Sequence, residues 1–289
     1  MIFFSSDPDF ERFYEGFTKN GLKVDLLVTE SPKKQGRHQE ISPNVAHAFA
    51  IKEGIEVRYY DKLDKIAQQE LGKMIPEDKL GFIFAYGKMI PENIINLFPN
   101  GILNIHFSLL PEYPGASPIQ QALIDDISET GYTVFEITSA LDQGKLLIQK
   151  KARILPDDNF DSLRSKIISK AIEELPDVIK KYLNWEIKLT ELPKLKAVFT
   201  HRISKQDGLI TDQDNARSAY NKIRAFSRWP KTYLIIDGKR FIIHSAKLVS
   251  GRLEIEKIQP EGKNPMDFDQ FKNGYQALLT KIPQFVKLN

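Results

Sequence analysis

The chain has 289 residues, a formal net charge of +3, 42% hydrophobic residues and no cysteine. This length allows two domains, and the hydrophobic fraction is that of a globular protein with a packed core. The absence of cysteine excludes disulfides, thiolate nucleophiles and zinc–sulfur sites. No apolar run approaches the roughly 20 residues that a membrane-spanning helix needs, and the first residues lack the basic region of a signal peptide. We therefore expect a cytoplasmic protein that does not enter a membrane.

The charge is divided unevenly along the chain. Residues 1–192 contain 23 Lys and Arg against 29 Asp and Glu, a net charge of −6. Residues 193–289 contain 18 Lys and Arg against 9 Asp and Glu, a net charge of +9. A basic C-terminal part indicates a polyanionic partner such as nucleic acid, although such a charge can also serve solubility alone.

Short apolar runs alternate with amphipathic runs in the first part of the chain. Strands are expected over residues 2–5, 24–28, 57–59, 80–85 and 101–106, and helices over residues 10–17, 43–50, 64–71 and 91–98. Phe10, Phe13 and Phe17, for example, recur at helical spacing. Residues 29–42 are polar and rich in Lys and Arg, so we expect a loop there. This alternation predicts a mainly parallel, doubly wound α/β sheet.

The rest of the chain predicts the end of this domain and a second, smaller one. We expect a helix over residues 119–124, strands over 133–137 and 146–154, and a long helix over 158–182. The first domain then covers residues 1–188, a linker covers 189–194, and the second domain covers 195–289. In the second domain we expect a helix over 214–226 and strands over 233–236, 241–247 and 252–259. Asp237-Gly238 is a hairpin signal, and the short strands predict a small β-barrel of the oligonucleotide-binding (OB) kind.

One strand ends in two polar side chains that suit acyl-transfer chemistry. Asn104 and His106 stand at positions i and i+2, so on a strand they point to the same side. The carboxyl ends of strands are where open α/β sheets bind ligands. A neutral imidazole can take a proton from an amine while an amide stabilises a developing oxyanion. Asp142, in a second loop beside Gly144, would orient the imidazole.

Alternative interpretations of the same residues remain open. A histidine near a strand end is often structural, Asn can cap a turn, and Asp-x-Gly is a common turn. The chain has no G-x-G-x-x-G after its first strand, no phosphate-binding P-loop and no G-x-S-x-G nucleophile motif. Its five histidines have no metal-ligand spacing, so we predict no metal.

The string NIHFSLLPEYPGASP from Asn104 to Pro118, together with LDQG from Leu141 to Gly144, resembles the folate-dependent formyltransferase family. The resemblance implies a Rossmann-like fold and 10-formyltetrahydrofolate as the co-substrate. It implies that Asn104 holds the formyl oxygen, that His106 assists removal of a proton from the attacking amine, and that Asp142 orients His106. It also implies folate contacts from two segments, which are Ser108, Leu109, Leu110 and Pro111, and Tyr86, Gly87, Lys88, Met89 and Ile90. The composition of the second segment alone would favour a plain strand-to-helix turn.

The acceptor amine is indicated by two further strings. Residues 29–42, with Gly36-Arg37, resemble the inserted loop of the family members that formylate methionyl initiator tRNA for translation initiation, and QPEGK at 259–263 resembles the same members. Lys33, Lys34 and Arg37 would then contact phosphates; a solvated surface loop is the alternative. Formylation of a nucleotide-linked amino sugar, or a non-catalytic RNA-binding module, are the competing functions. We expect a monomer.

The chain also departs from the family pattern. Ser6-Asp7 stands where a Gly-Thr pair is usual, Pro114 where an arginine is usual, and Glu112 where a basic residue is frequent. Between Lys247 and Arg252 lie only four residues, where family members carry a few dozen more. We therefore expect a trimmed C-terminal barrel.

Overall fold

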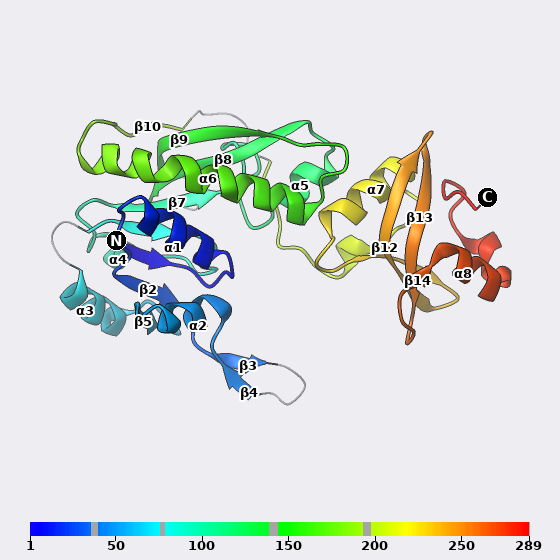
Figure 1. Cartoon of the computed structure of the whole chain (residues 1–289), viewed down its shortest axis with the longest axis horizontal. Coiled ribbons are helices and arrows are strands. Elements are labelled where there is room, and N and C mark those ends of the chain that lie inside the picture. Colours follow the sequence, from blue (N-terminus) through cyan, green and yellow to red (C-terminus); the bar gives the residue numbers. More distant parts are fainter. Residues whose placement is uncertain (36–39, 76–78, 139–143, 193–197, 289) are drawn as a thin grey trace. The chain divides into compact units, whose positions relative to one another are not determined.

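The computed structural model describes residues 1–35, 40–75, 79–138, 144–192 and 198–288. Its larger sheet has eight strands in the order β10-β9-β8-β7-β6-β1-β2-β5 (Figure 1). The strands are β1 (Ile2–Phe4), β2 (Leu26–Thr29), β5 (Glu56–Tyr59), β6 (Gly81–Ile83), β7 (Ile102–His106), β8 (Glu129–Ile137), β9 (Gly144–Arg153) and β10 (Thr190–Glu191). The five strands from β5 to β7 are parallel to their neighbours. β8 then runs antiparallel to β7, and β10 runs antiparallel to β9.

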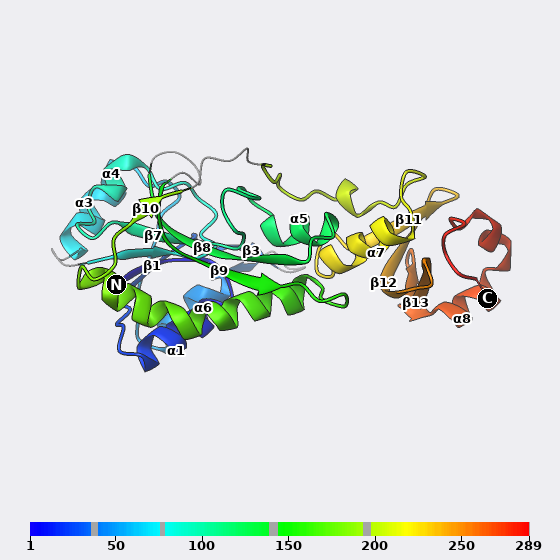
Figure 2. The ribbon, with the colours of Figure 1, turned by 90° about the horizontal axis from the view of Figure 1, so that it is seen from above.

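Helices cover both faces of this sheet, which makes it doubly wound. The helices are α1 (Phe10–Lys19), α2 (Val45–Lys52), α3 (Lys65–Met74), α4 (Glu92–Ile95), α5 (Pro118–Ile124) and α6 (Phe160–Leu183). α1 and α6 lie on one side of the sheet and α3 and α4 on the other (Figure 2). The predicted mainly parallel α/β fold is confirmed.

The periodicity of α1 explains how one of these layers is held. Phe10, Phe13 and Phe17 are fully buried, and each packs its ring against Phe3 of β1, with centroids 5.1 to 6.2 Å apart. Within the same helical layer, Arg12 of α1 donates a hydrogen bond from Nη2 to Ser169 Oγ of α6 at 2.9 Å. The Phe spacing read from the sequence therefore identifies the face of α1 that contacts the sheet.

One predicted loop contains regular structure. Within residues 29–42, β3 (Lys33–Gln35) and β4 (Glu40–Ser42) form an antiparallel pair. The prediction of a plain loop is therefore wrong for these residues. Neither strand has the apolar alternation that marks a half-buried strand, because the hairpin extends from the sheet (Figure 1) and is held by backbone pairing instead.

The C-terminal part contains a four-stranded antiparallel sheet in the order β11-β12-β13-β14. Its elements are η1 (Gln206–Gly208), α7 (Ala216–Ala225), β11 (Thr232–Ile236), β12 (Lys239–Val249), β13 (Arg252–Pro260), β14 (Met266–Asp267), α8 (Phe268–Gly274) and η2 (Gln276–Lys281). The small β-domain predicted at the C-terminus is confirmed as an antiparallel sheet, and its core contains apolar side chains such as Phe241, Leu253 and Phe271.

Two tight hairpins determine the register of this sheet. Asp237 and Gly238 both have positive φ, 50° and 73°, as a type I′ turn requires. Ser250 and Gly251 repeat the arrangement with φ of 49° and 75°. The hairpin predicted at Asp237-Gly238 is present, and the short connection after Lys247 is a two-residue turn.

The chain forms two compact units, which are described separately. The first contains Met1–Glu112, Gly131–Lys151 and Ile167–Ala197, and the second contains Tyr113–Thr130, Ala152–Lys166 and Val198–Asn289. The second unit therefore takes in two segments from the first part of the chain. The sequence boundaries 1–188 and 195–289 stay a prediction. None of the described helices has the length and apolar character needed to cross a membrane.

Candidate active site

The predicted catalytic amide and imidazole both lie on β7. Asn104 pairs with Ile83 of β6 and with Phe135 of β8, while His106 pairs with Thr133 of β8. Their i and i+2 positions on a regular strand direct both side chains to one face. His106 is buried, with 8% of its surface exposed. The Asn104 amide is half-buried and makes no hydrogen bond within the ranges that the structure describes, which leaves its N–H groups available to a substrate oxygen.

Asp142 lies outside the described residues, so its approach to His106 stays a prediction. Its neighbour Gly144 is described, as the first residue of β9. A Cβ atom at Gly144 would overlap the carbonyl oxygen of Glu136 and lie 3.1 Å from Phe135 Cδ2. The glycine of the LDQG string is therefore required by the close approach of β8.

The loop from Ser108 to Pro111 follows β7 directly. Ser108 is fully buried, and its hydroxyl donates a hydrogen bond to the carbonyl oxygen of Glu112 at 2.6 Å. Leu110 is 2% exposed, whereas Leu109 and Pro111 are half-buried. The Ser108 hydroxyl therefore stabilises the loop from within.

Two polar side chains that the sequence did not single out hold this loop. Thr133 of β8 and Gln149 of β9 form hydrogen bonds to the backbone of Ser108 and Leu110. A threonine and a glutamine inside strands are ordinary residues, so no sequence signal distinguishes them.

The segment from Tyr86 to Ile90 follows β6 and lies beside the end of β7, because Phe84 and Phe107 pack with ring centroids 5.7 Å apart. Tyr86 and Ile90 are buried in the core, so their side chains do not line an open cleft. The Tyr86 hydroxyl has no hydrogen-bond partner within the described ranges, and burial raises its pKa well above the ordinary value.

The exposed part of this segment consists of Gly87 and Met89. Gly87 has a φ of 80°, and Met89 is 72% exposed. Lys88 is tied down, since its ammonium donates to the carbonyl oxygens of Tyr60 and Asp61, the latter at 3.3 Å. The segment can therefore offer a ligand its backbone at Gly87 and the thioether of Met89.

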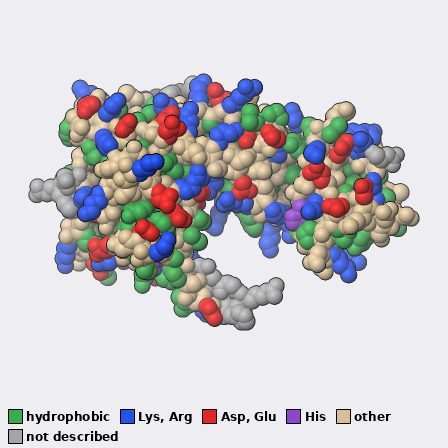
Figure 3. Space-filling model, in the orientation of Figure 1, with side chains coloured by type: hydrophobic (Ala, Val, Ile, Leu, Met, Phe, Trp, Pro, Cys, Tyr) green, Lys and Arg blue, Asp and Glu red, His purple; other side chains and the backbone are tan. Residues whose placement is uncertain are grey.

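The basic residues of the β3–β4 hairpin differ in their surroundings. Lys33 forms an ion pair with Glu30 at 2.7 Å and is 63% exposed at the side chain, whereas Lys34 is exposed and has no ion pair within the described ranges. Arg37 lies outside the described residues. On the face drawn in Figure 3, Lys and Arg side chains are interspersed with Asp and Glu. Within the described ranges, no group of three His, Asp or Glu side chains could hold a metal ion.

Comparison with known proteins identifies the family of this chain. Residues 1–179 match the formyl transferase family, and residues 202–252 match the C-terminal domain of formyl transferases. The chain belongs to the formyltransferase family. As a formyltransferase it is an enzyme that transfers a one-carbon group, as the sequence predicted.

Relatives of this formyltransferase cover almost all of the chain. The methionyl-tRNA formyltransferase of Sulfurihydrogenibium sp. (strain YO3AOP1) is 31% identical over 290 residues, covering 98% of this chain and 92% of that protein. A 4-N formyltransferase from Francisella tularensis shares the fold with a TM-score of 0.64 at 18% identity, covering 83% of this chain and 93% of that one. An N-formyltransferase from Helicobacter canadensis, in complex with folinic acid and dTDP-3-aminofucose, has a TM-score of 0.61 at 16% identity and covers 92% and 97%.

Proposed function

We propose that this formyltransferase moves a formyl group from 10-formyltetrahydrofolate to the free amino group of methionyl initiator tRNA, in translation initiation. The observation that carries this proposal is the 31% identity to a methionyl-tRNA formyltransferase over 98% of the chain. That match includes the basic C-terminal part of the chain, to which we assign a role in binding the tRNA. The enzyme would act in the cytoplasm, where translation takes place, and as a monomer.

The residues of β7 have the chemistry that this transfer needs. The folate supplies the formyl carbon. The Asn104 amide, which is free within the described ranges, donates an N–H to the formyl oxygen as it becomes negative. His106 takes the proton that the amine loses on attack, and Asp142 orients the imidazole for that step. When the carbonyl re-forms, the bond to the folate nitrogen breaks and that nitrogen is protonated.

The folate would lie against the two loops that flank these side chains. The structure leaves Gly87 and Met89 exposed after β6 and Leu109 and Pro111 half-buried after β7. Tyr86, Ile90, Ser108 and Leu110 are buried, so we assign them a structural part in shaping the two loops. Lys88 holds the first loop to Tyr60 and Asp61, which directly follow β5.

The tRNA would be bound by two separate regions. The first is the β3–β4 hairpin with Lys33, Lys34 and Arg37, and the second is the basic domain over residues 195–289, with a net charge of +9 for residues 193–289. Phosphate contacts from such residues give affinity without base specificity. The catalytic domain over residues 1–188 would do the chemistry.

A formyl-transfer assay tests the proposal directly. The full chain and 10-formyltetrahydrofolate are incubated in parallel with methionyl-tRNA, with unacylated tRNA plus free methionine, and with a dTDP-linked amino sugar. We expect formyl-methionine only on methionyl-tRNA. Transfer to the amino sugar at a higher kcat/KM would replace the proposal with the second candidate.

That second candidate is formylation of a nucleotide-linked amino sugar. The observation in its favour is the fold shared with the Helicobacter canadensis enzyme over 92% of this chain. Against it stand the 16% identity of that match and the higher identity to a tRNA enzyme.

A further inference from the structure

The loop from Ser108 to Pro111 is fastened by two side chains beneath it. The Thr133 hydroxyl donates to the carbonyl oxygen of Ser108 at 2.7 Å and accepts from the backbone N–H of Leu110 at 3.0 Å. Gln149 donates from Nε2 to the carbonyl oxygen of Leu110 at 2.8 Å and to the Thr133 hydroxyl at 3.0 Å. Strands β8 and β9 thus hold three backbone groups of a loop that belongs to neither.

The hydrogen-bonding capacity of the Thr133 hydroxyl is fully used. A hydroxyl offers one donor and two acceptor positions, and here the donor serves Ser108 while the acceptors serve Leu110 and Gln149. Thr133 has 0% exposure, so water cannot replace a lost partner. Removing this hydroxyl would leave the N–H of Leu110 buried and unsatisfied.

The Leu109 side chain of the same loop packs closely against Gly131 of β8. A Cβ atom at Gly131 would lie 2.7 Å from Leu109 Cδ2 and 2.9 Å from the carbonyl carbon of Lys150. Only glycine leaves room for both neighbours. Leu109 therefore contacts β8 at Gly131, two residues before Thr133.

Thr133 also relates this loop to the catalytic strand. In the antiparallel register of β7 and β8, Thr133 is the residue opposite His106. The residue that holds the loop, Thr133, is therefore also the residue that pairs with His106 across the two strands. A displacement of loop or strand changes the separation between a ligand on the loop and the side chains of Asn104 and His106.

We propose that Thr133 and Gln149 are positioning residues for formyl transfer. They fix the position of the Ser108–Pro111 loop relative to β7, and this position sets the distance from the folate formyl group to the side chains of Asn104 and His106. The inference rests on the proposed function, in which this loop contacts the folate. A misplacement of about 1 Å in such a reaction can cost about 10²-fold in rate. Neither side chain needs to touch the reacting atoms.

The chain contains a matched control for Thr133. Thr130 lies on the same strand, is 1% exposed, and its hydroxyl has no hydrogen-bond partner within the described ranges. Thr130→Val and Thr133→Val therefore make the same chemical change in similarly buried positions. Only the second removes hydrogen bonds to the loop, and Thr133→Ser retains them.

The experiment measures steady-state formyl transfer and, separately, equilibrium binding of 5-formyltetrahydrofolate to each variant. We expect Thr133→Val to lower kcat by about 10- to 100-fold and to raise the KM for the folate, while the KM for the acceptor stays unchanged. Thr133→Ser should recover most of the activity, and Thr130→Val should resemble the wild type. Gln149→Met, which removes two of the bonds, should show the same pattern to a smaller degree.

The outcomes separate this inference from the proposed function. If the wild-type chain formylates no acceptor offered, the proposed function fails, and the folate-binding measurements on the same variants still decide the positioning role. Wild-type kinetics and binding in Thr133→Val would overturn the inference. Equal losses in Thr133→Ser and Thr133→Val would overturn it too, because the hydroxyl would then be irrelevant. If Thr133→Val does not fold, Gln149→Met gives the decision, and an unchanged folate KM and kcat in that variant reject the role.

Discussion

Arg224 of α7 donates a hydrogen bond from Nη2 to Asp126 Oδ1 at 3.1 Å, although 98 positions separate the two residues in the chain. The same guanidinium donates to Asn221 Oδ1 at 2.7 Å and to the carbonyl oxygen of Asp158 at 3.2 Å. Asp126 also forms an ion pair with Arg217, with 2.9 Å between Asp126 Oδ2 and Arg217 Nε. These contacts explain why residues 113–130 and 152–166 form one compact unit with the C-terminal sheet.

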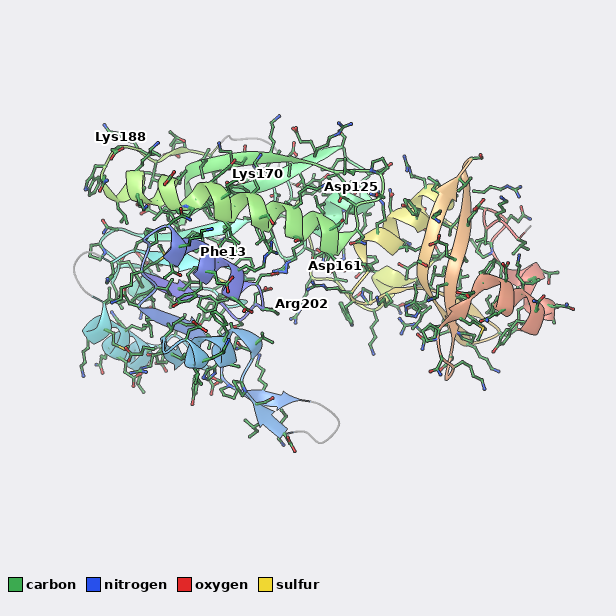
Figure 4. The ribbon with its side chains drawn as sticks, in the orientation of Figure 1. Phe13, Asp125, Asp161, Lys170, Lys188 and Arg202 are labelled. Atoms are coloured by element: carbon green, nitrogen blue, oxygen red, sulfur yellow. The ribbon has the colours of Figure 1, made fainter. Side chains whose placement is uncertain are left out.

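A second anchor repeats this arrangement at the start of α6. Asp161, labelled in Figure 4, accepts a hydrogen bond from Ser227 Oγ at 2.9 Å and forms an ion pair with Arg228. The segment from Ile223 to Pro230 therefore fastens α7 and its following turn to segments 113–130 and 152–166. This gives the segment a structural purpose that does not depend on the acceptor.

The first prediction concerns the Arg224 anchor. Asp126→Asn removes the carboxylate that two arginines share, and Asn tolerates the positive φ of 55° at this position. Because Arg224 is 5% exposed, we expect the loss of its charged partner to destabilise the fold by roughly 1–3 kcal/mol. Asp125→Asn, at the neighbouring exposed residue, should change stability by less than about 0.5 kcal/mol. Urea denaturation of both variants checks this, and equal midpoints would contradict it.

The second prediction concerns the amide and the imidazole of β7. Asn104→Ala should lower turnover by roughly 10²–10³-fold, the usual cost of one oxyanion donor, and His106→Ala by roughly 10²–10⁴-fold. Both variants should still bind 5-formyltetrahydrofolate. If His106 and Asp142 act as a unit, the double variant with Asp142→Asn should be little slower than either single one. Single-turnover rates with saturating substrates decide this, and losses that multiply would show two independent roles.

The third prediction concerns the β3–β4 hairpin. Arg37→Ala and Lys34→Ala should raise the KM for methionyl-tRNA and leave the folate KM unchanged, because the segments assigned to the folate follow β6 and β7 and do not include the hairpin. Each lost phosphate contact should reduce the slope of log affinity against log salt by up to about 0.9. Lys33→Ala should have a smaller effect, since Lys33 is already paired with Glu30 at 2.7 Å. A salt titration of tRNA binding measures the slope, and identical slopes in all three variants would make the hairpin a solvated surface feature.

The fourth prediction concerns pH. His47 is 7% exposed and its Nδ1 has no partner within the described ranges, and burial lowers its pKa below the ordinary 6.5. The unfolded chain therefore binds a proton at a higher pH than the folded chain does. The contribution of neutral His47 to stability is complete above about pH 6.5, the ordinary pKa of histidine. It is lost as the pH falls toward the lowered pKa of the folded state.

His47→Phe tests this, because it removes the titrating nitrogens but keeps an aromatic ring at a position whose ring centroid lies 5.7 Å from that of Tyr59. Urea midpoints are measured for both proteins between about pH 7.5 and pH 5. The wild type should lose more stability than the variant over this interval. Parallel curves would show that His47 is not the group that titrates.

Local chemistry determined much of what could be predicted. The spacing of Phe10, Phe13 and Phe17 identified the buried face of α1, because a helix repeats every 3.6 residues whatever surrounds it. Asp237-Gly238 indicated a hairpin, because few residues adopt positive φ at two successive positions. Asn104 and His106 were found through the two-residue repeat of a strand and through the family string around them. In each case the deciding energy lies within a few consecutive residues.

The tertiary structure decided which distant residues meet. The loop at Ser108–Pro111 is held by Thr133 and Gln149, whose positions depend on the register of β8 and β9. Likewise, the Arg224 anchor joins residues 98 positions apart. The β3–β4 hairpin was missed because its pairing uses backbone groups, which every residue carries. Side-chain patterns report local preference and burial, whereas register between remote segments is fixed only when the whole chain packs.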